Sequence, residues 1–518
     1  MSRTGTDTFD AATLEILWMR LISIVDEAAR MLVRSSFSAV VRESNDFACI
    51  ITDAKGRSLV QSSLSIPSFI GTLPQTVRHF LAEYPVETLE PGDVLITNDA
   101  WMGTGHLPDI SVARPIFLGR RVIGFAASVA HSPDIGGRIR SPEARNVFEE
   151  GLQIPVMKAV AAGVENETLI KILRKNVRVP DDVTGDLYAQ FSALQIMEQR
   201  LLGLAGEYGL DNLDELATVI HQRSENAMRQ EIARLPDGCY RSMVRTDGLA
   251  TPIELHMALT VRGEDIEVDL AGSSPQVDRA INVALCYTMA YVAFGVKAVL
   301  SPDIPNNDGA FRPIHVSAPK GSIVNSVFPA AGGARAVVGH YLPMLVLECL
   351  GQVVPDRVMA GSGAPIWCMN EAGIRNGAPY ANVYFFNGGT GASHRGKGHQ
   401  VLSWPSNISS TPVEVIEQRS PLRIAYKRLR EGGGGQGRYR GGDGQEIFFR
   451  NVGTEPITVS FMAERTKFGA AGIADGGAGA KGELHINDAA VDPKAQHTVG
   501  PGGTILLRMP GGGGYGKA

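Results

Sequence analysis

Apolar side chains recur at helical spacing from Ala12 to Ser35, which predicts a long amphipathic helix near the start of the chain. Two short apolar segments, Phe47–Asp53 and Ser58–Gln61, flank a glycine-containing turn and predict a β-hairpin. We then expect a helix from Thr72 to Tyr84 and a strand from Asp93 to Thr97. The opening region is therefore expected to mix helices with strands.

Two further strands, Val112–Phe117 and Val122–Val129, are predicted on either side of a turn at Leu118 to Arg120. Helical periodicity follows over Glu165–Lys175 and again from Asp186 to about Arg234. The later chain is expected to hold two strands and two apolar helices, at residues 253–262, 265–270, 280–300 and 336–350.

Together these elements predict an α+β, multidomain protein. Pro236-Asp-Gly238 ends the helical stretch and is the main expected boundary. After Glu431, glycine-rich turns separate short strands. We expect four parts: a mixed α/β domain with the candidate metal site, a helical segment, an α+β domain with buried helices, and a glycine-rich β region, at residues 1–185, 186–235, 236–430 and 431–518.

Composition narrows the class of protein. The 518 residues carry a net charge of −5, which gives no electrostatic reason to expect nucleic acid or an anionic membrane as partner. The five cysteines are scattered without a C-x-x-C pair, so a reducing cytoplasm is expected. Residues 1–10 lack an apolar signal core, and the apolar stretch at 280–300 contains Lys297, so a buried helix is favoured over a membrane span.

The pattern His-x-Pro-Asp-Ile occurs twice, beginning at His106 and at His131, with the predicted strand pair between the copies. A pairing centred on Leu118 and Gly119 would place His106 opposite His131. Imidazole and carboxylate are ligands that zinc or manganese accepts, so His106, Asp109 and His131 form a candidate catalytic metal site with an open position for water. The alternative is ordinary loop chemistry, because proline fixes φ and aspartate caps turns.

Other polar segments carry weaker signals. Asp46 stands at a strand start, where a solvated turn is the favoured interpretation. Asp134 or Glu149 is a candidate base beside a metal-activated water. Glycines 432–435, followed by two arginines, are more typical of a connecting loop than of an anion site. The chain has no Walker loop, dinucleotide fingerprint or nucleophile elbow, so ATP is not expected to bind to it.

Several motifs spread along the chain resemble the hydantoinase B/oxoprolinase family. They include Val41-Arg-Glu-Ser-Asn-Asp-Phe47, Gly92-Asp-Val-Leu-Ile-Thr-Asn-Asp99, Gly103-Thr-Gly-His-Leu-Pro-Asp-Ile110, Ala130-His-Ser-Pro-Asp-Ile-Gly-Gly137, Gly333-Ala-Arg335, Asn387-Gly-Gly-Thr-Gly391 and Pro510-Gly-Gly-Gly-Gly-Tyr515. A small departure is Asp278-Arg279, where related proteins often carry Arg-Gly-Pro. That departure bears on substrate preference and does not touch the candidate ligands.

The resemblance implies a partnership. A hydantoinase A type subunit would bind ATP with Mg²⁺ and phosphorylate a carbonyl or enol oxygen, and the B-type subunit would complete the reaction at one divalent metal, Zn²⁺ or Mn²⁺. Two histidines and an aspartate of the family map onto His106, His131 and Asp109, and a further aspartate maps approximately onto Asp46. A heterotetramer or larger complex is expected.

The implied substrate is a hydantoin, 5-oxoproline or a related lactam, whose ring the complex would open. The runner-up is the large subunit of an ATP-dependent ketone carboxylase, which resembles this chain over the same motifs; the compact length mildly favours the hydrolase. A third interpretation treats the chain as a non-catalytic scaffold for its partner.

Overall fold

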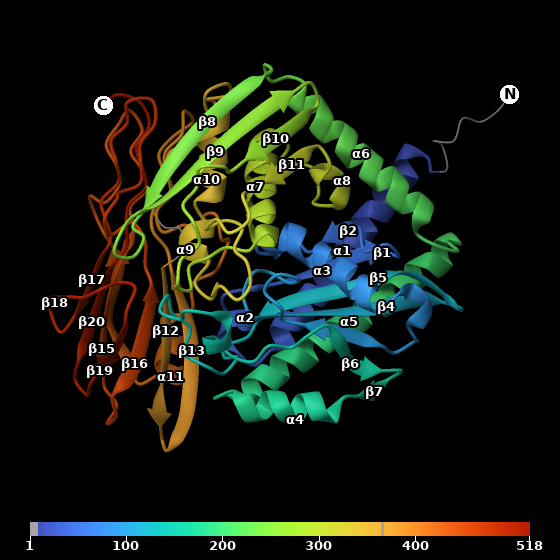
Figure 1. Ribbon diagram of the computed structural model, residues 1–518, viewed down its shortest axis with the longest axis horizontal. Helices are drawn as coiled ribbons and strands as arrows, with labels where there is room; N and C mark the ends of the chain where they lie inside the picture. Colours follow the sequence, from blue (N-terminus) through green and yellow to red (C-terminus); the bar gives the residue numbers. More distant parts are fainter. Residues whose placement is uncertain (1–8, 364–366) are drawn as a thin grey trace.

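The computed structural model describes residues 9–363 and 367–518, and it confirms a mixed α and β protein with several sheets (Figure 1). A seven-stranded antiparallel sheet forms the N-terminal part, in the order β2-β1-β5-β4-β3-β6-β7. Its strands are β1 Phe47–Asp53, β2 Ser58–Gln61, β3 Val94–Thr97, β4 Asp109–Leu118, β5 Arg121–His131, β6 Met157–Ala161 and β7 Val164–Glu165. The predicted hairpins at 47–61 and 112–129 are therefore confirmed.

Helices bury this sheet. The predicted N-terminal helix is confirmed as α1 (Ala11–Ser35), where the Asp10 carboxylate caps the free amides of Ala12 and Thr13 at 3.0 Å. Helix α1 packs against β1 and against α5 (Pro180–Tyr208), and α3 (Phe69–Glu83) packs on the central strands. Because β1 is buried along its whole length, its two faces are both covered, which explains its nearly continuous apolar sequence.

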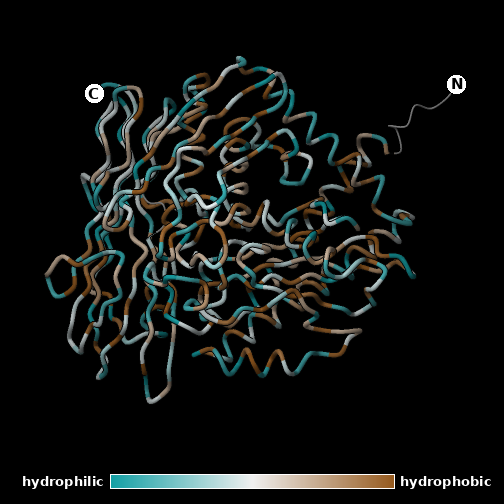
Figure 2. Tube along the Cα trace, in the orientation of Figure 1, coloured by the Kyte–Doolittle hydropathy of each residue, from teal (hydrophilic) through white to brown (hydrophobic). Residues whose placement is uncertain are grey.

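The helical stretch predicted from Asp186 to about Arg234 is two helices, α5 and α6 (Asp214–Ile232). Helix α5 begins earlier than predicted, with Pro180 in its first turn, where the missing amide costs nothing. It ends at Gly209, whose φ of +63° is the left-handed conformation that closes many helices. The amphipathic α4 (Glu167–Asn176) lies at the bottom of the molecule, where hydrophilic and hydrophobic residues alternate along its trace (Figure 2).

A four-stranded sheet, β11-β10-β9-β8, occupies the middle of the chain. Its strands are β8 Gly238–Thr246, β9 Ile253–Arg262, β10 Asp265–Asp269 and β11 Ile314–Ser317; β8 was not predicted. Three short helices and one long one accompany it: α7 Leu285–Leu300, α8 Asp308–Phe311, α9 Ala336–Gly339 and α10 Leu342–Leu350. The predicted helix at 336–350 is thus divided, because Pro343 has no amide to bond to the carbonyl of Gly339. No described helix is long and apolar enough to cross a bilayer.

Two further sheets form the C-terminal part, at the left of Figure 1. Their orders are β13-β12-β16-β19 and β14-β15-β20-β17-β18. A separate hydrophobic core that includes Trp367, Phe386 and Phe449 lies between them. The elements are β12 Trp367–Arg375, β13 Ala378–Phe386, α11 Val413–Arg419, β14 Leu422–Leu429, β15 Gln445–Asn451, β16 Ile457–Met462, β17 Glu483–Ile486, β18 Ala489–Ala490, β19 Gln496–Val499 and β20 Thr504–Arg508.

The glycine runs of the C-terminal part pack backbone against backbone. A Cβ added to Gly512 would lie 1.9 Å from the carbonyl oxygen of Thr390, and one added to Gly441 would lie 2.0 Å from that of Gly512. The same segments exchange main-chain hydrogen bonds, such as Gly435 N–H to Gly512 C=O. Glycine is required here for close approach, and the sequence 432–435 is part of this packing.

Glu371 on β12 is a fully buried carboxyl group that accepts hydrogen bonds from Tyr380 Oη (2.7 Å) and Ser420 Oγ (2.9 Å). Burial raises its pKa from 4.5 to about 7. The folded state therefore holds a proton that the unfolded chain releases, so this group's contribution to stability falls as pH rises from 4.5 to 7.

We expect Glu371→Gln to raise the free energy of unfolding at pH 8 by up to about 3 kcal/mol and to change it little near pH 4.5. Guanidinium unfolding of both proteins at the two pH values measures the difference. Glu225→Gln is the matched control, because Glu225 is ion-paired with Arg229 and Arg312 and its pKa is lowered, so its loss should destabilise the protein at pH 8. An equal effect of Glu371→Gln at both pH values would contradict the assignment.

Candidate metal centre

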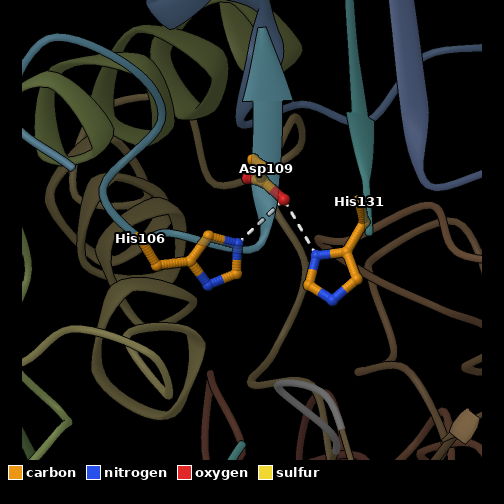
Figure 3. Close-up of side chains that lie close together, drawn as sticks. All are labelled: His106, Asp109 and His131. Carbon is orange, nitrogen blue, oxygen red and sulfur yellow. Dashed lines mark hydrogen bonds and ion pairs between the residues drawn. The ribbon is translucent and has the colours of Figure 1, made fainter. Parts of the chain in front are cut away.

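His106, Asp109 and His131 meet in the interior at the end of the strand pair β4–β5 (Figure 3). His106 Nε2 and His131 Nδ1 each lie 2.8 Å from the same oxygen, Asp109 Oδ1. The three side chains are at most 2% exposed, and one potential ligand atom from each lies within 4.8 Å of the others. Asp109 begins β4 and His131 ends β5, so the sheet itself holds two of the three groups.

The register of this hairpin corrects the sequence-based pairing. His131 lies opposite Asp109, not opposite His106. The connecting turn is centred one residue later than predicted, and a bulge between Ile116 and Phe117 shifts the register further. His106 instead reaches the site from the loop before β4, which Asn98 secures by donating from Nδ2 to the carbonyl of Leu107 at 2.8 Å.

The surroundings of His106 fit a cation. Its Nδ1 faces the carbonyl oxygen of Gly333 at 3.2 Å, so that nitrogen carries the proton and Nε2 presents a lone pair. Nε2 has no hydrogen-bond donor among the described residues and points at a carboxylate oxygen. Burial, and then the charge of Arg335, holds the pKa of His106 well below its usual value. A neutral imidazole and a carboxylate that face each other in this way suit a divalent ion.

Asp109 is a carboxylate, and other side chains bind one of its two oxygens. Arg335 Nη2 lies 2.9 Å from Oδ2, and the Thr104 hydroxyl donates to the same oxygen. Burial alone would raise the pKa of Asp109, but the Arg335 guanidinium and the hydrogen bond from His131 hold it well below its usual value. Oδ1 is therefore the oxygen left to the two histidines.

Arg140 determines which ring nitrogen of His131 carries the proton. Its Nη1 lies 3.1 Å from His131 Nε2, and its Nε donates to the carbonyl of Gly333 at 2.9 Å. Because a guanidinium has only donors, His131 Nε2 accepts and Nδ1 carries the proton toward Asp109. Binding an ion through Nδ1 requires that proton to move to Nε2, so Arg140 would have to give up this contact.

The structure places Asp46 beside the triad. Residue 46 directly precedes β1, is 7% exposed, and has Oδ2 3.8 Å from His131 Nδ1. Burial raises its pKa to about 6 against the opposing effect of His131. The solvated turn favoured from the local sequence is wrong, because strand pairing and the C-terminal part of the chain cover this segment, as in the hydrogen bond from Ser409 N–H to Ser44 C=O.

The two carboxylates predicted to move protons lie outside the triad. Asp134 Oδ1 pairs with Arg178 Nη1 at 2.6 Å, and the side chain lines a cavity that His131 also borders. Glu149 is half-buried, with Oε2 3.3 Å from the Arg145 amide. Their catalytic roles stay a prediction.

Sequence reasoning missed the groups that support the triad from elsewhere in the chain. The buried Glu150 carboxylate accepts from the amides of Gly333 (2.5 Å) and Gly332 (3.3 Å), and burial raises its pKa to about 7. The Gly333 carbonyl in turn orients His106 and Arg140. Gly333-Ala-Arg335 was noted only as a family motif, and nothing in its spacing indicates that it faces residues more than 180 positions earlier.

Aromatic side chains close the far side of the triad. The Tyr287 ring lies 4.3 Å from the Arg335 guanidinium carbon, which holds that cation against Asp109. Tyr291 Oη and His340 Nε2 are 3.0 Å apart. Burial, and then the charge of Arg335, lowers the pKa of His340 to about 3, so His340 is neutral at physiological pH.

Comparison with known proteins gives a match along nearly the whole chain. The profile of the Hydantoinase B/oxoprolinase family covers residues 10–518. A protein assigned as the B-type subunit of a D-/L-hydantoinase, from Pseudomonas sp. (strain NS671), is 32% identical over 100% of this chain and 92% of its own length. The 5-oxoprolinase of Dictyostelium discoideum is 28% identical over 100% of this chain, which spans only 41% of that protein.

Two solved structures share the fold. The ATP-dependent caprolactamase from Pseudomonas jessenii has a TM-score of 0.88 and 26% identity, and the alignment covers 99% of this chain and 92% of that one. Nucleotide-free acetone carboxylase has a TM-score of 0.85 at 18% identity, with coverage of 97% and 75%. At that identity the second likeness concerns the fold alone.

Proposed function

This chain belongs to the hydantoinase B/oxoprolinase family, and from that membership and its buried triad we propose that it is the B-type subunit of an ATP-dependent cyclic-amide hydrolase. The observation that carries the proposal is the convergence of two imidazole nitrogens on one buried carboxylate oxygen, each at 2.8 Å. The substrates are hydantoins, 5-oxoproline or related lactams.

The reaction needs activation before water can attack. Amide resonance makes an unstrained ring carbonyl a poor electrophile, and phosphorylation of its oxygen in the imidate form removes that protection. Water then adds to the activated carbon, and the ring nitrogen takes up a proton as its bond to that carbon breaks, which leaves the opened chain as an acyl phosphate. A second water hydrolyses this acyl phosphate to the carboxylate and inorganic phosphate. This chemistry requires a buried site that stabilises the negative charge of the phosphoryl group and activates water.

The residues around the triad meet those needs. His106, Asp109 and His131, with Asp46 as a fourth candidate ligand, would hold a divalent ion, which when bound supplies a Lewis acid and water of lowered pKa. Arg335 and Arg140 place two positive charges beside the triad, where they would attract the phosphoryl group. Of the two predicted proton carriers, Asp134 is the better placed, because it lines the cavity next to His131.

ATP is proposed to bind to a hydantoinase A type partner. The chain contains no Walker loop and no dinucleotide fingerprint. It spans 41% of a 5-oxoprolinase, so the remaining part of that longer protein would correspond to a separate subunit here. The divalent ion is proposed to be Zn²⁺ or Mn²⁺, and the complex a heterotetramer or larger.

The test is turnover by the reconstituted complex. We expect the chain, co-purified with its A-type partner, to open hydantoin, 5-oxoproline or a simple lactam only when ATP is present, with ring opening followed by chromatography and ATP use by ADP release. Acetone and acetophenone with bicarbonate are assayed in parallel. Turnover of the ketones alone would instead indicate a ketone carboxylase. Normal turnover by a complex that carries His131→Ala would indicate that the chain is a non-catalytic scaffold.

A further inference from the structure

A separate cavity lies between α10 and the glycine-rich C-terminal part of the chain. It holds about 340 Å³, which is within the size range of small-molecule sites, and none of the three triad residues borders it. An open groove adjoins the cavity and shares lining residues with it, namely Leu347, Val358, Met359 and Trp404. This groove gives a small molecule a route into the cavity from the surface.

One side of α10 forms a wall of the cavity. Met344, Leu347, Glu348 and the C-capping Gly351 all line it, and their spacing of three or four residues places them on the same face of the helix. Glu348 is the one charged residue of α10. The helix therefore presents an apolar wall to the cavity with a single carboxyl group in it.

Glu348 has no partner for its charge. It is the only acidic or basic residue among the described residues that line the cavity, and its carboxyl group makes no hydrogen bond or ion pair with them. Burial raises its pKa to about 7, against the charge of Arg465, whose Nη1 donates instead to the carbonyl of Gly469 at 3.2 Å. Glu348 also lies in the last turn of α10, where the negative end of the helix dipole favours a cation.

The rest of the lining is mostly apolar and includes two aromatic residues. Val358, Met359 and Ile473 supply aliphatic groups, and Trp404 and Tyr515 supply aromatic ones. A cation is attracted by an aromatic ring as well as by a carboxylate. An uncharged molecule would leave the carboxyl group unpaired, and an anion would meet a like charge. The lining therefore suits an organic cation with an apolar body.

We propose that this cavity is a second binding site, which takes a small apolar ammonium ion whose nitrogen donates to the Glu348 carboxylate. The hydrocarbon part of the ion packs on the aliphatic and aromatic lining. The cation stabilises the charged form of Glu348, which burial by itself disfavours. The site does not depend on the proposed function, because it contains no residue of the triad and takes no part in ring opening.

Calorimetry tests the site with benzylamine as the probe and benzyl alcohol as its uncharged counterpart. We expect the chain to bind benzylamine at least about tenfold more tightly than benzyl alcohol, because a hydrogen bond between charged groups is stronger than one to a neutral hydroxyl. Glu348→Gln should lower the affinity for benzylamine by at least about tenfold and change that for benzyl alcohol by less than about threefold.

Glu198→Gln is the matched control. Glu198 is a partly buried carboxylate on α5 that pairs with Arg114 Nε at 2.6 Å, and it does not line the cavity. Its substitution should leave both affinities unchanged. Met359→Trp, which places a larger side chain where the cavity meets the groove, should weaken the binding of both probes.

Three results would overturn the site: no measurable binding of benzylamine to the parent, equal affinity of the parent for the two probes, or undiminished benzylamine binding by Glu348→Gln. Unchanged binding of both probes by Met359→Trp would place the bound amine elsewhere and would also overturn it. Because none of these measurements involves turnover, the proposed function and the amine site stand or fall separately.

Discussion

Replacing His106 with asparagine is expected to abolish ATP-dependent ring opening, with kcat falling by about 10³-fold or more because a Lewis acid worth several kcal/mol would be lost. The His106 Nε2 lone pair faces Asp109 Oδ1 at 2.8 Å and is the ligand atom that needs no change of protonation before it binds an ion. The substitution should also remove the bound metal, measured by elemental analysis of the purified complex. The partner's binding of ATP should be unchanged.

His221→Asn provides the control for loss of a buried histidine. His221 lies in α6, is fully buried, and contacts the carbonyl of Ser58 through Nε2 at 2.8 Å. The His221→Asn substitution should lower the melting temperature of the protein, but the complex should keep its metal and show no comparable loss of kcat. A His106→Asn complex that keeps its metal and its turnover would show that the triad is structural.

The second large effect is expected from Arg335→Met. Arg335 and Asp109 are 5% and 1% exposed at the side chain, and their 2.9 Å pair is the main cationic contact of Oδ2. Removing one partner of a buried ion pair leaves an uncompensated charge, so we expect a loss of about 3–5 kcal/mol in unfolding free energy. Asp109 is also released from its orientation, and metal affinity should fall by about 10–100-fold, as for other groups that position a ligand.

Lys494→Met separates these two consequences. Lys494 and Glu464 form another buried pair, at 2.6 Å, in the C-terminal part of the chain. Denaturant unfolding should show a comparable loss of stability for both variants, whereas metal titration should show weakened binding only for Arg335→Met. If Arg335→Met binds metal as the parent does, Arg335 stabilises the fold without organising the site.

The local sequence was sufficient to predict an element wherever the hydrophobic pattern of that element depends only on residues nearby in the chain. The spacing that predicted α1, the alternation of β9 and the two hairpins of the first sheet all express burial of one face or stripe of a single element. The repeated His-x-Pro-Asp-Ile motif located the triad for the same reason, since its three side chains lie within one hairpin and the loop before it.

Tertiary structure decided the rest, because it depends on segments that are distant in sequence. The later turn and a bulge together placed His131 opposite Asp109, and the covering chain turned Asp46 from a candidate surface residue into a buried neighbour of the triad. Arg335 and Glu150 carry no spacing signal, since each meets the site only after the two halves of the chain pack together. Periodicity reports how one element is buried, while charge pairing, tautomers and the walls of a cavity are set by which elements meet.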